Sequence, residues 1–222
     1  MLLILFSIHN KLGDFTRSDD DEEKSSVTYA IRQYRFFQQY TGDVVNGWDV
    51  VILETKTEIH LDKYRKIFAT ICEDDDRMRP VRAIGMGLTD SEKATRPHTL
   101  MEANLVEVPE RECLEVFGHG LAPLNSEVCV KAMDKVATCM GDSGGPVFVT
   151  ENDEPKCLYG LVSYGRADRP CGSLLSPTVF AKISFYYPLM AETGIRVAYS
   201  FEVKSSRCLK IAFYALFFTQ IS

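Results

Sequence analysis

One segment of the chain holds a serine in a setting that suits covalent chemistry. Residues 139–146 read CMGDSGGP, with Ser143 between an aspartate and two glycines. Acyl transfer to a serine requires a hydroxyl that projects from a tight turn, with backbone N–H groups beside it to hold an oxyanion. Gly141 lets the backbone approach a substrate closely, and Gly144 and Gly145 allow turn dihedrals that a Cβ atom would forbid. The pattern predicts a nucleophile at Ser143; the alternative is a glycine-rich turn that locks a buried Asp142.

A serine hydroxyl is a poor nucleophile at neutral pH, so it needs a base, usually a histidine, and a carboxylate that orients the base. Asp49 stands at the head of an apolar run, in NGWDVVIL over residues 46–53. A charge in that place would be costly to bury without a partner. The chain has four histidines, His9, His60, His98 and His119.

The elements that must position these residues are mostly short strands. Runs rich in Val, Ile, Phe and Tyr alternate with Gly, Pro, Asp and Asn turns, and helix signals are scarce. The clearest runs are residues 50–53, 81–84, 104–108, 147–150, 158–163 and 179–183. This spacing predicts antiparallel barrels or sandwiches. The apolar opening, residues 1–8, is a poor match to a signal peptide, and the alternative is a buried strand.

Composition excludes several classes of protein. The 222 residues carry 25 Lys and Arg against 31 Asp and Glu, a net charge of -6 that argues against a nucleic-acid binder. No apolar stretch reaches the ~20 residues that a membrane-spanning helix needs. The seven cysteines include no C-x-x-C pair, which leaves zinc ribbons and thioredoxin-like sites without support. We interpret several of them as disulfides of a secreted protein.

The segment around Ser143 resembles the nucleophile motif of the trypsin/chymotrypsin family of serine endopeptidases. Three further segments support the resemblance: GLVSYG at 160–165 resembles the strand that pairs with the substrate, PTVFAKI at 177–183 the next strand, and VRAIGMGLT at 81–89 the entry to the second barrel. The resemblance implies that Ser143 is the nucleophile and that the N–H groups of Gly141 and Ser143 form the oxyanion hole.

The same resemblance implies the other two catalytic residues. The family's chain order is His, Asp, Ser, and Asn46–Leu53 resembles its aspartate strand, so Asp49 is the expected orienting carboxylate. Only His9 precedes Asp49, in the context ILFSIHN, where the family has an apolar run followed by T-A-A-H-C. We expect His9 to be the base; the alternative is that the true base is missing. His60 and His98 are expected to be solvated, and His119 to be structural or solvent-facing.

Substrate contacts are also implied by the resemblance. Ser163, Tyr164 and Gly165 would form the edge that pairs with the substrate. Ala137, six residues before Ser143, would lie at the base of the primary pocket, and Thr178 would form part of its wall. An apolar base with a threonine wall implies a preference for small or medium apolar side chains. For the disulfides, the family pattern implies the pairs Cys113–Cys129 and Cys139–Cys171, and it gives no partner to Cys72, Cys157 or Cys208.

The family's mature chain begins with a segment such as I-V-G-G, whose amine pairs with the Asp before the serine. No such segment occurs here. We therefore expect either a fragment or a degenerate relative, with the first barrel incomplete.

The prediction is an all-β protein of two antiparallel Greek-key barrels. Residues 1–71 would form the incomplete N-terminal barrel, 72–82 a linker, 83–194 the C-terminal barrel and 195–222 a tail. It would be a secreted, monomeric serine endopeptidase that acts on proteins or peptides, binds neither nucleic acid nor membrane, and needs no metal or organic cofactor. The alternative is a catalytically impaired homologue that acts as a binding or regulatory protein.

Overall fold

The computed structural model is mostly β-structure. It describes residues 3–6, 30–57, 68–73, 78–90, 94–118, 126–152, 154–166, 171, 176–192 and 210–212. The strands are β1 (Leu3–Phe6), β2 (Ile31–Phe36), β3 (Val51–Thr55), β4 (Phe68–Thr70), β5 (Pro80–Gly85), β6 (Met101–Glu107), β7 (Glu127–Ala132), β8 (Pro146–Glu151), β9 (Glu154–Gly165), β10 (Thr178–Lys182) and β11 (Lys210–Ala212). The helices are η2 (Val44–Asn46), α1 (Glu110–Phe117) and α2 (Ile183–Glu192).

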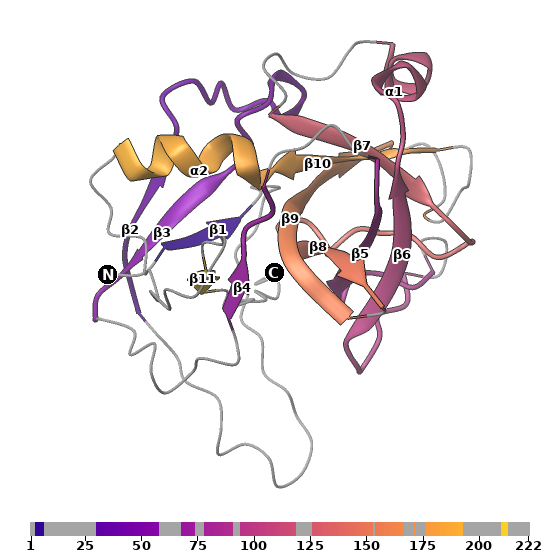
Figure 1. Cartoon of the computed structure of the whole chain (residues 1–222), viewed down its shortest axis with the longest axis horizontal. Helices are drawn as coiled ribbons and strands as arrows, with labels where there is room; N and C mark the ends of the chain where they lie inside the picture. The colour runs from indigo at the N-terminus through magenta and orange to yellow at the C-terminus, as the bar shows by residue number, and fades with distance from the viewer. Residues whose placement is uncertain are drawn as a thin grey trace, which may run out of the picture.

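Six of these strands close into an antiparallel barrel, in the order β10-β7-β6-β5-β8-β9 (Figure 1). Alternating burial along β5 shows which face of the barrel forms the core. The side chains of Val81 and Ala83 are buried and those between them are less so, because successive residues of a strand point to opposite faces. The buried side chains meet those of the facing strands in one apolar core. The expectation of an all-β fold with a C-terminal barrel is confirmed.

The N-terminal half forms an open sheet within the described residues. Its three strands lie in the order β1-β3-β2 and are antiparallel, and a separate pair joins β4 to β11. The apolar opening of the chain thus contributes a strand, β1, paired with β3 over Leu3–Phe6. Figure 1 shows this sheet beside the barrel, with β9 curving between the two. The incompleteness of the first barrel stays a prediction.

Helix α2 was not expected from the sequence. Its sequence, ISFYYPLMAE, is rich in aromatic residues and contains Pro188, and both features lower helix propensity. Tertiary packing overrides that propensity, because Ile183, Tyr186 and Met190 are fully buried in the core that α2 shares with β3 and β9. Figure 1 shows α2 lying across the end of the three-stranded sheet. The helix therefore fixes β3, the strand that follows Asp49, against the barrel.

Three disulfides cross-link the described part of the chain. Cys113 bonds to Cys129 and Cys139 to Cys171, the pairs that the family pattern implies. The third bond, Cys72–Cys157, was not expected, and it ties the second residue after β4 to β9 across a sequence separation of 85.

The two-barrel division into residues 1–71, 72–82, 83–194 and 195–222 stays a prediction. The last residues of the expected linker already belong to β5. In the part of the chain that is described, no helix has the length and apolar character to cross a membrane.

Candidate active site

Asp49 is held inside the protein by the turn that precedes β3. Trp48 adopts a left-handed backbone conformation with φ of 63°, and its N–H donates to the hydroxyl oxygen of Tyr186 on α2 at 3.1 Å. The N–H of Val50 donates back to the Trp48 carbonyl at 2.7 Å. A positive φ at a bulky residue persists only when its surroundings hold it. This turn carries Asp49 inward, where it is only 1% exposed.

The Asp49 carboxylate meets a hydroxyl from the barrel. Ser163 Oγ on β9 donates to Asp49 Oδ2 at 2.5 Å, and Ser163 itself is 3% exposed. A hydrogen bond to an ionised carboxylate is stronger than one between neutral groups, and the low polarity of the surroundings strengthens it further. Because Asp49 and Ser163 are 114 residues apart, this bond joins the N-terminal sheet directly to the barrel.

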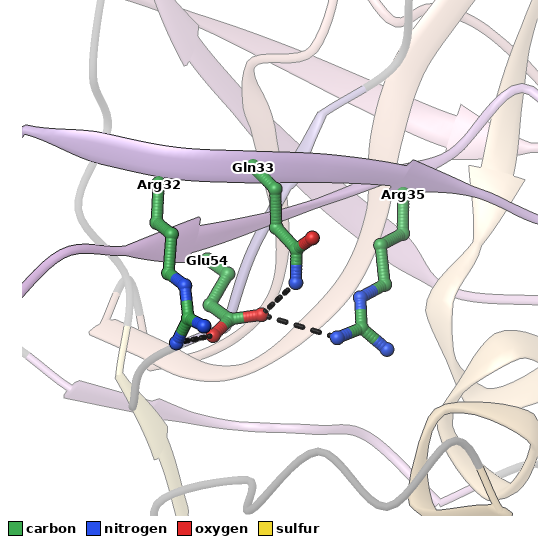
Figure 2. Close-up of polar contacts among 4 residues, drawn as sticks. All are labelled: Arg32, Gln33, Arg35 and Glu54. Carbon is green, nitrogen blue, oxygen red and sulfur yellow. Dashed lines mark hydrogen bonds and ion pairs between the residues drawn. The ribbon is translucent and has the colours of Figure 1, made fainter.

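A second carboxylate fixes the register of β3 against β2 (Figure 2). Glu54 is 4% exposed and accepts hydrogen bonds from Arg32 at 3.2 Å, from Arg35 at 3.2 Å, and from the Gln33 amide. Figure 2 shows the three donors reaching down from β2 onto this one carboxylate. The hydrogen bond from Gln33, together with the two guanidinium charges, holds the pKa of the Glu54 carboxyl below its usual value. The clamp keeps the strand that begins next to Asp49 in place.

Ser143 lies on an exposed turn that is hydrogen-bonded to β9, the strand to which the Asp49 carboxylate is also bonded. The N–H of Gly144 donates to the Val162 carbonyl at 2.7 Å, and the N–H of Val162 donates to Gly145 at 3.0 Å. Val162 is the neighbour of Ser163 on β9. Adjacent residues of one strand therefore hold the serine turn and the Asp49 carboxylate, which places the two expected catalytic groups on a common support.

The Asp142 side chain folds back and braces the serine turn from within. Its carboxylate accepts the N–H of Gly87 at 2.7 Å and that of Cys139 at 2.8 Å. A Cβ atom on Gly85 would lie 2.1 Å from Asp142 Oδ1, so only glycine leaves room for this carboxylate. Burial raises the pKa of the Asp142 carboxyl, and the two backbone hydrogen bonds and the charge of Arg96 oppose that rise.

Gly141 has the backbone conformation that the turn requires. Its φ is 98°, a region that residues with a Cβ rarely adopt. The N–H of Leu88 donates to the carbonyl of Met140 at 2.9 Å and ties the turn to the segment after β5. The turn before Ser143 is thus held on both sides, by β9 and by residues 87–88.

The expected substrate-contacting residues fall into two places. Ser163, Tyr164 and Gly165 end β9, where Gly165 pairs with Thr178 of β10. An added Cβ on Gly165 would lie 3.7 Å from the Thr178 side chain, so these two residues face each other. Ala137 is half-buried and lines a cavity of about 190 Å³ together with Asp142, Gly87 and Thr138. Among the described residues that line this cavity, Ala137 is the only expected substrate contact.

Of the four histidines, only His98 is among the described residues. His98 is exposed, in line with its expected solvation. His9, the expected base, lies outside the described residues, as do His60 and His119. Among the described residues there is no cluster of His, Cys, Asp and Glu that could hold a metal ion.

Two features of the site escaped the sequence analysis. Ser163 was expected only as a substrate contact, yet its hydroxyl is also the hydrogen-bond donor to Asp49. The disulfide of Cys157 anchors β9 five residues before Val162 and was also missed. Only a fold brings such distant residues together, so no local signal marks them.

Comparison with known proteins gives consistent matches. A family model described as Trypsin matches residues 7–190. The chain is 27% identical to ovochymase of Halocynthia roretzi over 191 residues, 83% of this chain and 12% of the relative. It is 28% identical to the serine protease filzig of Drosophila melanogaster over 86% of this chain and 11% of the relative. It is also 28% identical to mouse hepatocyte growth factor activator serine protease over 72% of this chain and 25% of the relative.

The solved structures agree on the fold. Mouse neuropsin, a serine protease, superposes with a TM-score of 0.64 at 21% identity, over 75% of this chain and 72% of that chain. The chain spans about a tenth to a quarter of the length of the curated relatives above, so the match concerns one region of each. The family model covers most of the chain, including the barrel, the serine turn and the Asp49 strand, and the chain therefore belongs to the trypsin family of serine proteases.

Proposed function

We propose that this chain is a serine endopeptidase that cleaves peptide bonds through an acyl-enzyme at Ser143. The observation that carries the proposal is the joint support of the site by β9, where Ser163 binds Asp49 and its neighbour Val162 clasps the serine turn. With the serine turn and the buried Asp49 carboxylate both hydrogen-bonded to this strand, the mechanism further requires an imidazole.

The proposed mechanism gives each of these residues a defined part. Ser143 Oγ attacks the carbonyl carbon of the scissile bond while His9 accepts the hydroxyl proton, and Asp49 orients the imidazole and stabilises its positive charge. The N–H groups of Gly141 and Ser143 hold the oxyanion. The C–N bond then breaks, and the leaving amine takes the proton from His9. Water, deprotonated by His9, then attacks the acyl carbon; the ester bond to Ser143 Oγ breaks, His9 returns the proton to that oxygen, and the acid is released.

The role of His9 rests on the family's chain order. Its position lies within the matched residues 7–190 and before Asp49, as that order demands. A carboxylate accepts several hydrogen bonds, so the one that Asp49 accepts from Ser163 is compatible with a second one from an imidazole N–H.

A preference for small or medium apolar side chains before the scissile bond is the specificity that we propose. Ala137 offers no charge to a Lys or Arg side chain, and the Thr178 side chain lies 3.7 Å from where a Cβ on Gly165 would be, so we expect it to form part of the pocket wall. One methylene in such a pocket is worth only about 1–3 kcal/mol, so the preference should be broad.

Proteins and peptides are the substrates that a protease of this family implies. Three disulfides are typical of proteins that mature in an oxidising compartment, and we propose that this one is secreted and acts as a monomer.

Digestion of a peptide library, analysed by mass spectrometry, tests the proposal. We expect internal cleavage after Ala, Val, Leu or Thr by the wild-type chain and none by Ser143→Ala. Cleavage mainly after Lys or Arg would contradict the proposed specificity. Absence of cleavage by a folded, disulfide-bonded chain would contradict the endopeptidase and favour a homologue that binds or regulates other proteins.

A further inference from the structure

Arg96 brings a positive charge to the turn that carries Ser143. A Cβ atom built on Gly141 would lie 2.9 Å from Arg96 Nη1 and 3.2 Å from the Cα of Gly87, so the guanidinium rests against the Cα of Gly141. The Arg96 side chain is exposed. Within the part of the chain that the structure describes, it forms neither a hydrogen bond nor an ion pair, and its charge acts to lower the pKa of the Asp142 carboxyl.

The backbone on which Arg96 stands is anchored to the active site. The N–H of Leu88 donates to the Met140 carbonyl at 2.9 Å, and the next residue, Thr89, donates its N–H to the carbonyl of Thr95 at 2.9 Å. Thr95 in turn donates its N–H to the backbone carbonyl of Asp90 at 3.2 Å. Pro97 follows directly and fixes its own φ. Arg96 therefore directly follows a residue that is bridged antiparallel to Asp90, in a segment bonded to the serine turn.

The position of Arg96 relative to β9 identifies the part of a substrate that it would meet. Gly144 and Gly145, on one side of Ser143, bond to β9, whose end at Ser163–Gly165 is the proposed pairing edge for the acyl part of the substrate. Gly141, on the other side of Ser143, faces Arg96 and Gly87. A peptide whose acyl part paired with β9 would therefore leave Ser143 on the Gly141 side, and its leaving-group part would pass the guanidinium.

We propose that Arg96 is a specificity-determining residue that favours an acidic side chain in the first or second position after the scissile bond. The inference rests on the proposed endopeptidase and deepens it by naming a substrate class. A guanidinium suits this task because it stays charged and offers paired N–H donors that match a carboxylate. An exposed pair of this kind contributes modestly and is screened by salt, so the effect is a preference and not an absolute requirement.

Peptide binding to the Ser143→Ala protein tests the inference without cleavage. Three fluorescent peptides share the acyl side and differ in having Glu, Gln or Lys at one of the two positions after the scissile bond. We expect the Glu peptide to bind about two- to five-fold tighter than the Lys peptide at low ionic strength. The difference should shrink in 0.5 M salt, a concentration at which the Debye length falls to about 4 Å.

Charge reversal makes the test specific to Arg96. In the Ser143→Ala background, Arg96→Glu should reverse the order so that the Lys peptide binds tighter, and Arg96→Gln should remove the preference. The control is Arg111→Gln on α1, a similarly exposed arginine whose partner is Glu115, and it should leave the order unchanged. Equal binding of the Glu and Lys peptides, no binding of any peptide, or a preference that survives Arg96→Glu would overturn the inference.

Hydrolysis of the same peptides by the chain with Ser143 intact separates this inference from the proposed function. A higher kcat/KM for the Glu peptide supports both. If no peptide is cleaved, the endopeptidase proposal fails, whereas the binding order with Ser143→Ala still decides the role of Arg96.

Discussion

The hydrogen bond from Ser163 to Asp49 predicts that removal of one atom, Ser163 Oγ, lowers the stability of the protein substantially. Ser163→Ala removes Oγ and takes this donor away from the carboxylate of Asp49, a residue that is 1% exposed. A hydrogen bond to a charged group contributes about 1.5–3 kcal/mol, and burial prevents water from replacing it. For a chain of this size, 1 kcal/mol shifts Tm by about 2–4 °C. We therefore expect Ser163→Ala to lower Tm by roughly 3–12 °C, with the three disulfides retained.

The assay is a double-mutant cycle followed by calorimetric unfolding. In an Asp49→Asn background the acceptor is neutral, and the same serine deletion should cost only about 0.5–1.5 kcal/mol. The difference between the two losses is the coupling energy, which we expect to be about 1 kcal/mol or more. Equal losses in both backgrounds, or no loss for Ser163→Ala alone, would refute the reasoning that this bond holds the carboxylate in place.

Three other perturbations follow from the structure. The pKa of Glu54 is lower in the folded protein, so the carboxylate stabilises the fold above the unfolded pKa near 4.5, and this stability is lost as pH falls through the folded pKa. Glu54→Gln should therefore weaken the dependence of Tm on pH in the acid range. An unchanged pH profile would contradict the role of Glu54 in holding β2 and β3. Replacing Cys72 and Cys157 by Ala should cost about 2–5 kcal/mol of stability, measured by denaturant unfolding, because the bond closes a long loop; a loss under 1 kcal/mol would contradict this. Gly141→Ala places a Cβ at a φ of 98° and against the Arg96 guanidinium, and it should lower the free energy of unfolding by about 1–2 kcal/mol and slow any reaction at Ser143 ten-fold or more. A variant with wild-type stability and rate would show that this turn does not require glycine.

Much of the fold could be predicted because local patterns encode it. The strands β5, β8, β9 and β10 coincide with short apolar runs between turn residues, and the CMGDSGGP segment forms the tight turn that its glycines indicate. Helix α2 could not be predicted in this way, since its helical state depends on burial against β3 and β9 and not on its own propensity.

The contacts that complete the site are long-range. Ser163 lies 114 residues from Asp49, and Cys72 lies 85 residues from Cys157. The sequence marks each residue as suited to polar or covalent contact but does not say which residue it meets. Arg96 is a similar case, because it becomes relevant only when the bridge between Asp90 and Thr95 brings it against Gly141. The positions and roles of His9 and of the substrate contacts stay predictions.

The most direct measurement is the reaction of the disulfide-bonded chain with a fluorophosphonate probe, followed by mapping of the adduct by peptide mass spectrometry. If Ser143 is a nucleophile activated through an imidazole that Asp49 orients, one adduct forms, on Ser143. Ser143→Ala then gives no adduct, and Asp49→Asn reacts at least a hundred-fold more slowly. An adduct on another residue, or labelling of Ser143 at the same rate in Asp49→Asn, would contradict the account.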